Sequence, residues 1–176
     1  MVLSHESGLL QHMKPGSMLI DHTTSSPGLA IRVAEACKRY KIDVVDAPVS
    51  GADIGAANGT LVTMCGGDAA AYERAKPYMK LYSATTKLMG GPGAGQHTKA
   101  VNQIMIAANM IGTVEAMVYG HKAGLDLNEV LNLLSQGAAG SFMMSTLGPR
   151  MLKRDFEPGT HVEHFFKDLG IVLDEA

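Results

Sequence analysis

A lysine and an asparagine follow a glycine-rich run in the stretch GPGAGQHTKAVNQ, which covers residues 91–103. Lys99 and Asn102 are three residues apart, so on a helix they share one face. Such a pair raises the question whether the glycine-rich run directs the lysine toward chemistry. The helix dipole disfavours a lysine in a first turn, which hints at a specific role. Taken alone, the stretch is also compatible with an exposed surface lysine.

The glycines of this stretch fit neither of two common phosphate-binding loops. The P-loop pattern places its lysine directly after the last glycine, whereas Lys99 lies four residues after Gly95. The dinucleotide pattern G-x-G-x-x-G requires a third glycine where this chain has Thr98. The run therefore predicts a flexible, closely approaching start of a helix and no phosphate cradle.

Two other loops carry polar groups at predicted strand ends. In DAPVSGADIGAANGTL, residues 46–61, Ser50 offers a hydroxyl, and Gly51 lets backbone N–H groups approach an anion such as a carboxylate. In IDHTTSSP, residues 20–27, Thr23 and Thr24 follow an earlier strand. Ligands of α/β sheets usually bind at such edges. Each loop alone is equally well interpreted as a turn or a helix cap.

Strands and helices alternate through the first half of the chain and helices alone follow. Strands are predicted over Met18–Asp21, Ile42–Ala47, Leu61–Cys65 and Thr85–Met89, with helices over Leu29–Tyr40 and Ala69–Met79. This alternation predicts an α/β layer with a largely parallel sheet. After Gly95, helices are predicted over Gln96–Ala123, Leu127–Gln136, Phe142–Arg154 and from about Val162. We predict an α/β domain over residues 1–93 and an all-helical domain over residues 94–176.

Charge and composition exclude several classes of function. The formal net charge of -2 provides no basic field for nucleic acid. Cys37 and Cys65 lie in unrelated contexts without a CxxC pattern, which predicts two buried thiols in a reducing compartment. His161 and His164 have metal-ligand spacing but no third ligand, so no metal site is predicted.

One apolar run, residues 100–119, is long enough to raise the question of a membrane span. It contains Asn102, Gln103, Asn109 and Glu115, which are costly in lipid, so we predict a soluble protein with no membrane partner. Small residues recur every fourth position at Ala108, Gly112, Ala116 and Gly120. Such a stripe lets another helix approach closely, from the same domain or from a partner.

Together these segments resemble the β-hydroxyacid dehydrogenase family. The resemblance rests on D-A-P-V-S-G followed by G-T-L, on G-x-G-x-x-x-K-x-x-N, on IDHTTSSP, and on F-x-P-G and K-D-L at residues 156–159 and 167–169. It covers essentially the whole chain, in the family's order. The group includes 3-hydroxyisobutyrate dehydrogenase, tartronate semialdehyde reductase and, more distantly, 6-phosphogluconate dehydrogenase.

The resemblance implies the C-terminal part of a Rossmann-like nucleotide-binding domain followed by an all-α domain. It also implies NAD or NADP as cofactor, a small hydroxyacid or its semialdehyde as substrate, a homo-oligomer, and a mitochondrial or cytoplasmic location. The site residues that it implies are Lys99 as catalytic acid and base, Asn102 as its orienting neighbour, Ser50 and Gly51 as substrate anchors, and Thr24 and Lys167 on the cofactor side.

Some features depart from the family pattern. Many members read S-G-G where this chain has Ser50-Gly51-Ala52. Asn102-Gln103 stands where the 6-phosphogluconate branch has His-Asn, which favours the small-hydroxyacid branch. The family's G-x-G-x-x-G segment and the residue that selects NAD or NADP are absent, so the chain is interpreted as a truncated member. The alternatives are a reductase of tartronate, glyoxylate or succinic semialdehyde, and a non-catalytic homologue that acts as a dimerising or binding scaffold.

We expect this chain by itself to bind the dinucleotide weakly or not at all. The helix N-terminus that would hold the pyrophosphate is not encoded in its residues. Titration with NADH, followed by nucleotide fluorescence, measures the affinity. Tight binding would show that the pyrophosphate has another site in these residues.

Overall fold

The computed structural model describes residues 8–176 and divides into two compact units. The first comprises Met1–Asn102 and Gly159–Ala176, and the second comprises Gln103–Pro158. The final helix α8 (Val162–Glu175) thus belongs to the unit that contains the sheet, whereas the predicted division at residue 93 groups it with the other helices. The first seven residues of the predicted α/β domain lie outside the described part of the chain.

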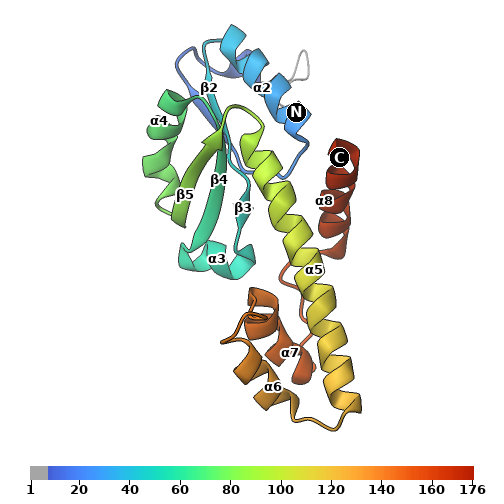
Figure 1. The fold of residues 1–176 in the computed structure, drawn as a ribbon. Helices are drawn as coiled ribbons and strands as arrows, with labels where there is room; N and C mark the ends of the chain where they lie inside the picture. Colours follow the sequence, from blue (N-terminus) through green and yellow to red (C-terminus); the bar gives the residue numbers. More distant parts are fainter. Residues whose placement is uncertain (1–7) are drawn as a thin grey trace. The chain divides into compact units, whose positions relative to one another are not determined.

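The first unit is built on a five-stranded sheet (Figure 1). Its strands are β1 (Met18–Asp21), β2 (Asp43–Asp46), β3 (Val49–Ser50), β4 (Leu61–Gly67) and β5 (Ser83–Gly90). β4 pairs with β2, β3 and β5, and β1 pairs with β2. The parallel pairings of β1 with β2 and of β4 with β5 join four and six residue pairs, whereas each antiparallel pairing joins two. The predicted α/β class is therefore confirmed.

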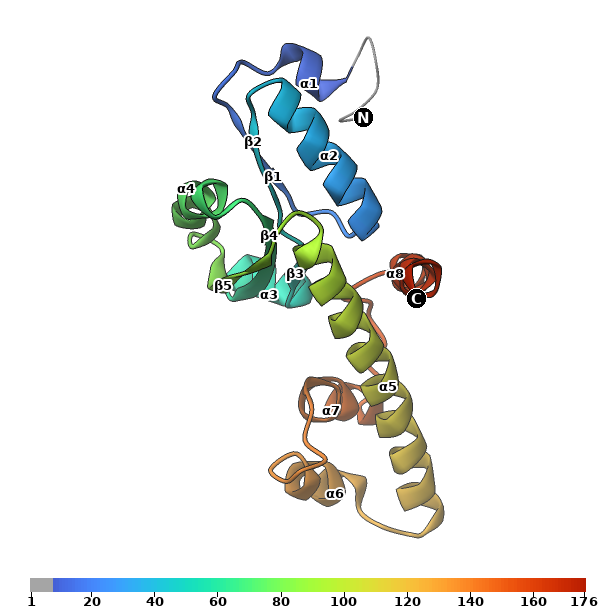
Figure 2. The same ribbon diagram turned by 45° about the horizontal axis from the view of Figure 1, so that its top comes forward.

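Helices α2 (Pro27–Arg39) and α4 (Ala69–Met79) cover opposite faces of this sheet (Figure 2). Successive strand residues point to opposite faces. Val44 accordingly packs with the cluster on α2, and Val45 lies in the cluster on α4. Both helices begin at side-chain caps, because Ser26 Oγ accepts a hydrogen bond from Leu29 N and Asp68 Oδ1 accepts one from Ala70 N. Each cap fixes the first residue of its helix, and thereby the end of the loop that leads to it from the preceding strand.

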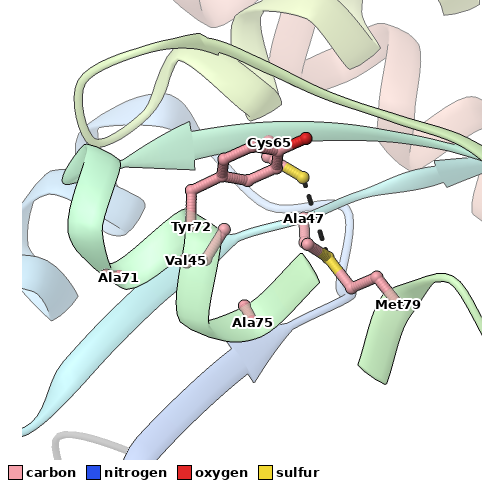
Figure 3. Packing of buried hydrophobic residues seen from close by; sticks show 7 residues of the cluster. All are labelled: Val45, Ala47, Cys65, Ala71, Tyr72, Ala75 and Met79. Atoms are coloured by element: carbon pink, nitrogen blue, oxygen red, sulfur yellow. Dashed lines mark hydrogen bonds between the residues drawn. The ribbon is translucent and has the colours of Figure 1, made fainter. Parts of the chain in front are cut away.

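Two sulfur-containing side chains pack against each other in the core beneath α4 (Figure 3). Cys65 Sγ lies 3.7 Å from Met79 Sδ, and Val45, Ala47 and Ala75 surround them without exposure to solvent. Burial raises the pKa of the Cys65 thiol to about 11, so the thiol stays protonated and unreactive. Cys37 is also buried, and the prediction of two buried thiols is confirmed.

Two short elements of the first unit escape the sequence prediction. The run predicted as turns after Pro48 contains β3 and the helix α3 (Ala52–Asn58). The short helix α1 (Leu9–His12) precedes β1 and lies where the sequence predicts a short apolar helix end before the KPG turn at residues 14–16. α3 ends at Gly59, whose φ of +67° is a left-handed conformation that glycine adopts without strain. Glycine and asparagine have low helix propensity, so the contacts of the fold outweigh the local preference there.

The second unit contains the remainder of α5 (Ala94–Lys122), which starts in the first unit, followed by α6 (Leu127–Leu134), η1 (Met143–Leu147) and α7 (Gly148–Leu152). η1 is a π-helical segment, so the single helix predicted over 142–154 is wrong in detail. Pro149 has no N–H to donate, which interrupts the α-helical ladder at this point. A Cβ at Gly148 would lie 2.9 Å from Leu131 Cδ1, so α6 and α7 pack closely.

α5 is the only helix among residues 8–176 that is long and apolar enough to cross a membrane, judged by length and composition alone. In its small-residue stripe, a Cβ at Gly120 would meet Leu127 Cδ2 at 2.9 Å. A Cβ at Gly112 would meet no described atom within 4 Å. Within the second unit, the last position of the stripe, Gly120, therefore packs against the first residue of α6.

Met79 provides a direct test of the core beneath α4. We expect Met79→Ala to lower the free energy of unfolding by about 2–5 kcal/mol, because the truncation leaves a cavity beside Cys65. Urea denaturation measures the loss. Tyr78→Ala is the matched control, since Tyr78 is 57% exposed on the same helix and should change stability by less than about 1 kcal/mol. Equal losses in both variants would contradict the described packing.

Candidate active site

A buried carboxylate holds the start of α5 against the sheet. Asp46, the last residue of β2, is 5% exposed. Its Oδ1 accepts a hydrogen bond from Gly93 N at 2.9 Å, and its Oδ2 accepts one from Gln96 N at 3.1 Å. Burial raises the pKa of Asp46, and the amide hydrogen bonds oppose this shift. The first amides of the helix therefore have an internal acceptor where a phosphate-binding helix would offer them to a ligand.

The glycines of the run allow this close approach. A Cβ at Gly95 would lie 2.6 Å from Met64 O and 2.7 Å from Asp46 O. No side chain fits between backbone atoms at such distances. Gly93 has a φ of +88°, a conformation that other residues rarely adopt. The run thus serves helix–sheet packing, in agreement with the predicted close approach at the start of the helix.

Lys99 is buried one turn further along α5. It is 7% exposed, and its Nζ donates a hydrogen bond to Val49 O at 2.8 Å. Burial lowers the pKa of Lys99, the charge of Asp168 raises it, and the charge of Lys167 lowers it further. An amine with a lowered pKa is neutral in a larger fraction of molecules near neutral pH, as a general base requires.

The hydrogen bond to Val49 places Lys99 next to the predicted substrate anchors. Ser50 follows Val49 directly in β3 and is half-buried. Gly51 caps α3 with a φ of +128°. Ala52 follows with a φ of +55°, a conformation that favours the glycine of the common S-G-G pattern. The loop therefore contains one strained alanine at this position.

The predicted cofactor-side residues also lie together. Lys167 Nζ on α8 donates a hydrogen bond to the backbone carbonyl of Thr24, in the loop after β1. It also forms an ion pair with Asp168 at 3.0 Å. Asn102 is half-buried on α5, three residues after Lys99. The structure thus brings Lys99 to Ser50 and Lys167 to Thr24, while the functional roles of these residues remain predictions.

Three further residues of the site do not follow from the sequence interpretation, namely Asp46, Gln96 and Asp168. Asp46 is the one with a readable signal, because an acidic residue directly follows the two valines of the strand, at its more buried end. A carboxylate at such a position must find donors when the strand is buried. Gln96 and Asp168 are buried through contacts with distant segments, for which the chain offers no local pattern.

Comparison with known proteins identifies the family. Residues 1–91 match the family model described as the NAD binding domain of 6-phosphogluconate dehydrogenase. Residues 93–176 match the model described as the NAD-binding domain of NADP-dependent 3-hydroxyisobutyrate dehydrogenase. The chain belongs to the β-hydroxyacid dehydrogenase family. The cofactor of this family is NAD or NADP, and its members are oxidoreductases.

Relatives of this family member come from bacteria and plants. It is 51% identical to the oxidoreductase YkwC of Bacillus subtilis over 97% of its own length and 59% of that protein. It is 46% identical to probable 3-hydroxyisobutyrate dehydrogenase-like 1, mitochondrial, of Arabidopsis thaliana over 99% of its length and 52% of the relative. It is 39% identical to the 2-hydroxy-3-oxopropionate reductase of Escherichia coli over 99% of its length and 60% of that enzyme.

A solved structure shares the fold of this chain. The crystal structure of 3-hydroxyisobutyrate dehydrogenase from Salmonella typhimurium matches with a TM-score of 0.85 and 31% identity, over 96% of this chain and 60% of that one. The chain spans between about half and three fifths of the length of these relatives.

The buried lysine predicts a dependence of stability on pH. Because burial lowers the pKa of Lys99 in the folded state from its usual 10.5, the folded state loses this proton before the unfolded state does. The unfavourable contribution of Lys99 is thus present at neutral pH and disappears as the pH rises to the unfolded value. We expect Lys99→Met to stabilise the chain at pH 7 by about 1 kcal/mol or more, and the gain to shrink toward pH 10.5.

Urea denaturation between pH 7 and pH 10 measures this gain. Lys76→Met is the control, because the ammonium of Lys76 pairs with exposed Glu73 at 3.1 Å and stays accessible to solvent. A Lys99→Met variant that is no more stable at pH 7, or whose gain does not vary with pH, would contradict the described environment of Lys99.

Proposed function

We propose that this chain carries the catalytic site of an enzyme that interconverts a small β-hydroxyacid, of the 3-hydroxyisobutyrate type, and its semialdehyde with NAD or NADP. The observation that carries the proposal is the buried Lys99, with its pKa lowered by burial and its Nζ held at Val49 O beside Ser50 and Gly51. A buried lysine costs stability, so a chemical use accounts for its position.

In the oxidation direction, the neutral amine of Lys99 takes the hydroxyl proton of the substrate. The electron pair of that O–H bond forms the C=O bond. The hydrogen on the carbon that bore the hydroxyl leaves as a hydride. NAD or NADP, when bound, supplies the hydride acceptor at C4 of its nicotinamide. In the reduction direction, the ammonium of Lys99 returns the proton to the carbonyl oxygen. Its bond to Val49 O keeps Nζ at a fixed place between these two steps.

Ser50, Gly51 and Asn102 would hold the substrate around this amine. A carboxylate of the substrate can accept hydrogen bonds from the Ser50 hydroxyl and from the backbone N–H groups near Gly51. Asn102 lies one turn beyond Lys99 and can donate to the substrate oxygen on the same helix face. Such anchors fix the reacting carbon relative to the base.

Thr24 and Lys167 would face the nicotinamide end of the cofactor. Thr24 lies in the loop after the carboxyl end of β1, which runs parallel to β2, and ligands of α/β sheets bind at this edge. The Lys167 side chain is half exposed while it donates to Thr24 O and pairs with Asp168, so its ammonium has one further donor for a carboxamide or a ribose hydroxyl.

A second candidate is a reductase of tartronate semialdehyde, which is 2-hydroxy-3-oxopropionate. The similarity to the Escherichia coli reductase favours it, since this relative is named for that substrate. Reductases of glyoxylate or succinic semialdehyde would use the same lysine chemistry. A non-catalytic scaffold is the less economical explanation, because binding alone gives no reason to bury an amine at 7% exposure.

The remaining proposals concern the whole protein. We propose a homo-oligomer, with the Ala108, Gly112 and Ala116 part of the α5 stripe as one surface that a partner helix could approach. The location is proposed as mitochondrial, in line with the Arabidopsis relative, or cytoplasmic in a bacterium. With a net charge of -2, a nucleic-acid partner is not proposed.

Lys99→Ala in the complete enzyme tests the proposed chemistry. We expect kcat to fall by about 10²–10⁴-fold, because a general acid–base group is removed, while the affinity for NAD or NADP changes little. Turnover is followed by nucleotide absorbance with 3-hydroxyisobutyrate, and with tartronate semialdehyde in the reverse direction. The ratio of kcat/KM for the two substrates decides between the two candidates.

Lys76→Ala serves as the control, since it removes an exposed lysine that pairs with Glu73. Its turnover should equal that of the unaltered enzyme. If Lys99→Ala keeps its turnover, Lys99 is not the acid–base group and the proposed mechanism fails.

A further inference from the structure

Gln96 is a buried polar residue that the proposed mechanism does not use. It is 2% exposed and lies three residues before Lys99 on α5, hence on the same face of the helix. An uncharged amide at such depth is costly unless its oxygen and nitrogen both have partners. A methionine or leucine would fill the same volume without that requirement.

Both ends of the Gln96 side chain bind the loop after β1. Nε2 donates to Thr23 O at 2.7 Å, and Oε1 accepts from Ser25 N at 3.1 Å. A backbone carbonyl only accepts and a backbone N–H only donates, so the two partners determine the orientation of the amide. Gln96 therefore holds the peptide groups on either side of Thr24, more than 70 residues away in the chain.

The same loop is held from the other side by α8. Thr24 O accepts a hydrogen bond from Lys167 Nζ, and Lys167 forms an ion pair with Asp168 at 3.0 Å. Asp168 is 8% exposed and its charge acts on Lys99. Hydrogen bonds and an ion pair thus run from Gln96 through the Thr24 loop to α8, and the charge of Asp168 on α8 acts on Lys99.

We propose that Gln96 is a positioning residue, which couples the helix that carries Lys99 to the Thr23–Ser25 loop on the cofactor side. The coupling sets the place of the proton-transferring amine relative to the nicotinamide end of the site. Its catalytic consequence rests on the proposed function, whereas the coupling itself is a property of this chain.

Gln96→Met tests the coupling because it keeps the volume and removes both hydrogen bonds. In this chain, we expect the Ser25 amide to exchange with solvent about tenfold faster or more, since it loses its acceptor. The Nζ of Lys99 should titrate at a higher pH than in the unaltered chain, because a loosened first turn admits water. NMR of amide exchange and of ¹⁵N-labelled lysine side chains measures both effects without turnover.

In the complete enzyme, the same variant should show a changed pH profile. Oxidation of the hydroxyacid requires the neutral amine, so the rate rises with pH until Lys99 has lost its proton. With Asp168 and Lys167 unchanged as the charged groups that act on Lys99, we expect this rise to move to higher pH in Gln96→Met. We also expect kcat to fall by about 10–100-fold, as a misplaced group causes. A loss of folded molecules alone would lower the rate without moving the profile.

Tyr72→Phe is the matched control, because it removes a buried hydroxyl that bonds Thr86 at 2.9 Å. This hydroxyl takes no part in the hydrogen bonds of Gln96 and Lys167. It should leave the Ser25 exchange, the Lys99 titration and the pH profile unchanged. If Gln96→Met does not fold, Gln96→Asn, which keeps the amide but is too short to span both partners, serves instead.

Unchanged Lys99 titration and pH profile in the Gln96 variant would overturn the proposal and leave Gln96 as core filling. The two proposals fail separately. Full turnover of Lys99→Ala would reject the acid–base role, while faster Ser25 exchange and a shifted Lys99 titration in Gln96→Met would still establish the coupling.

Discussion

The site depends on one interaction, the buried carboxylate of Asp46 at the start of α5. A helix N-terminus needs acceptors for its free amides, and here β2 supplies them from inside the protein through bonds to Gly93 N and Gln96 N. The carboxylate thereby joins the end of a strand to the helix that carries Lys99. The amides offset only part of the burial that raises the pKa of Asp46, so the same contact that costs desolvation also determines where the helix begins.

Once the helix start is fixed, the groups around Lys99 determine its pKa. The side chain ends at Val49 O with little access to water, which lowers its pKa. Asp168 and Lys167 act on it with opposite charges from α8, so the last helix adjusts the base without contributing a proton-transferring group of its own in the proposed reaction. Burial of such a lysine lowers the stability of the fold and increases the fraction of the amine that is neutral.

The local pattern of the sequence predicts part of this arrangement. The alternation of apolar strands and helices suffices for the α/β class, and the spacing of Lys99 and Asn102 suffices for their common helix face. The partners of Asp46 and Gln96 lie 47–73 residues away, and no local periodicity encodes them. For the same reason the run around Gly95 suggests flexibility, whereas its close contact with Met64 O makes glycine a packing requirement. α3 is missed because the fold overrides weak helix propensity.

Both lysines of the site donate to backbone carbonyls, those of Val49 and Thr24. A carbonyl is present whatever side chain its residue carries, so the ammonium groups keep their places when neighbouring side chains change. The Ser50 hydroxyl, which we propose faces the substrate, comes from the residue after Val49 and is therefore independent of the lysine contact. A scaffold that fixes its acid–base group through main-chain atoms can change its substrate by altering the side chains beside it. This separation is consistent with one family holding relatives named for 3-hydroxyisobutyrate and for 2-hydroxy-3-oxopropionate.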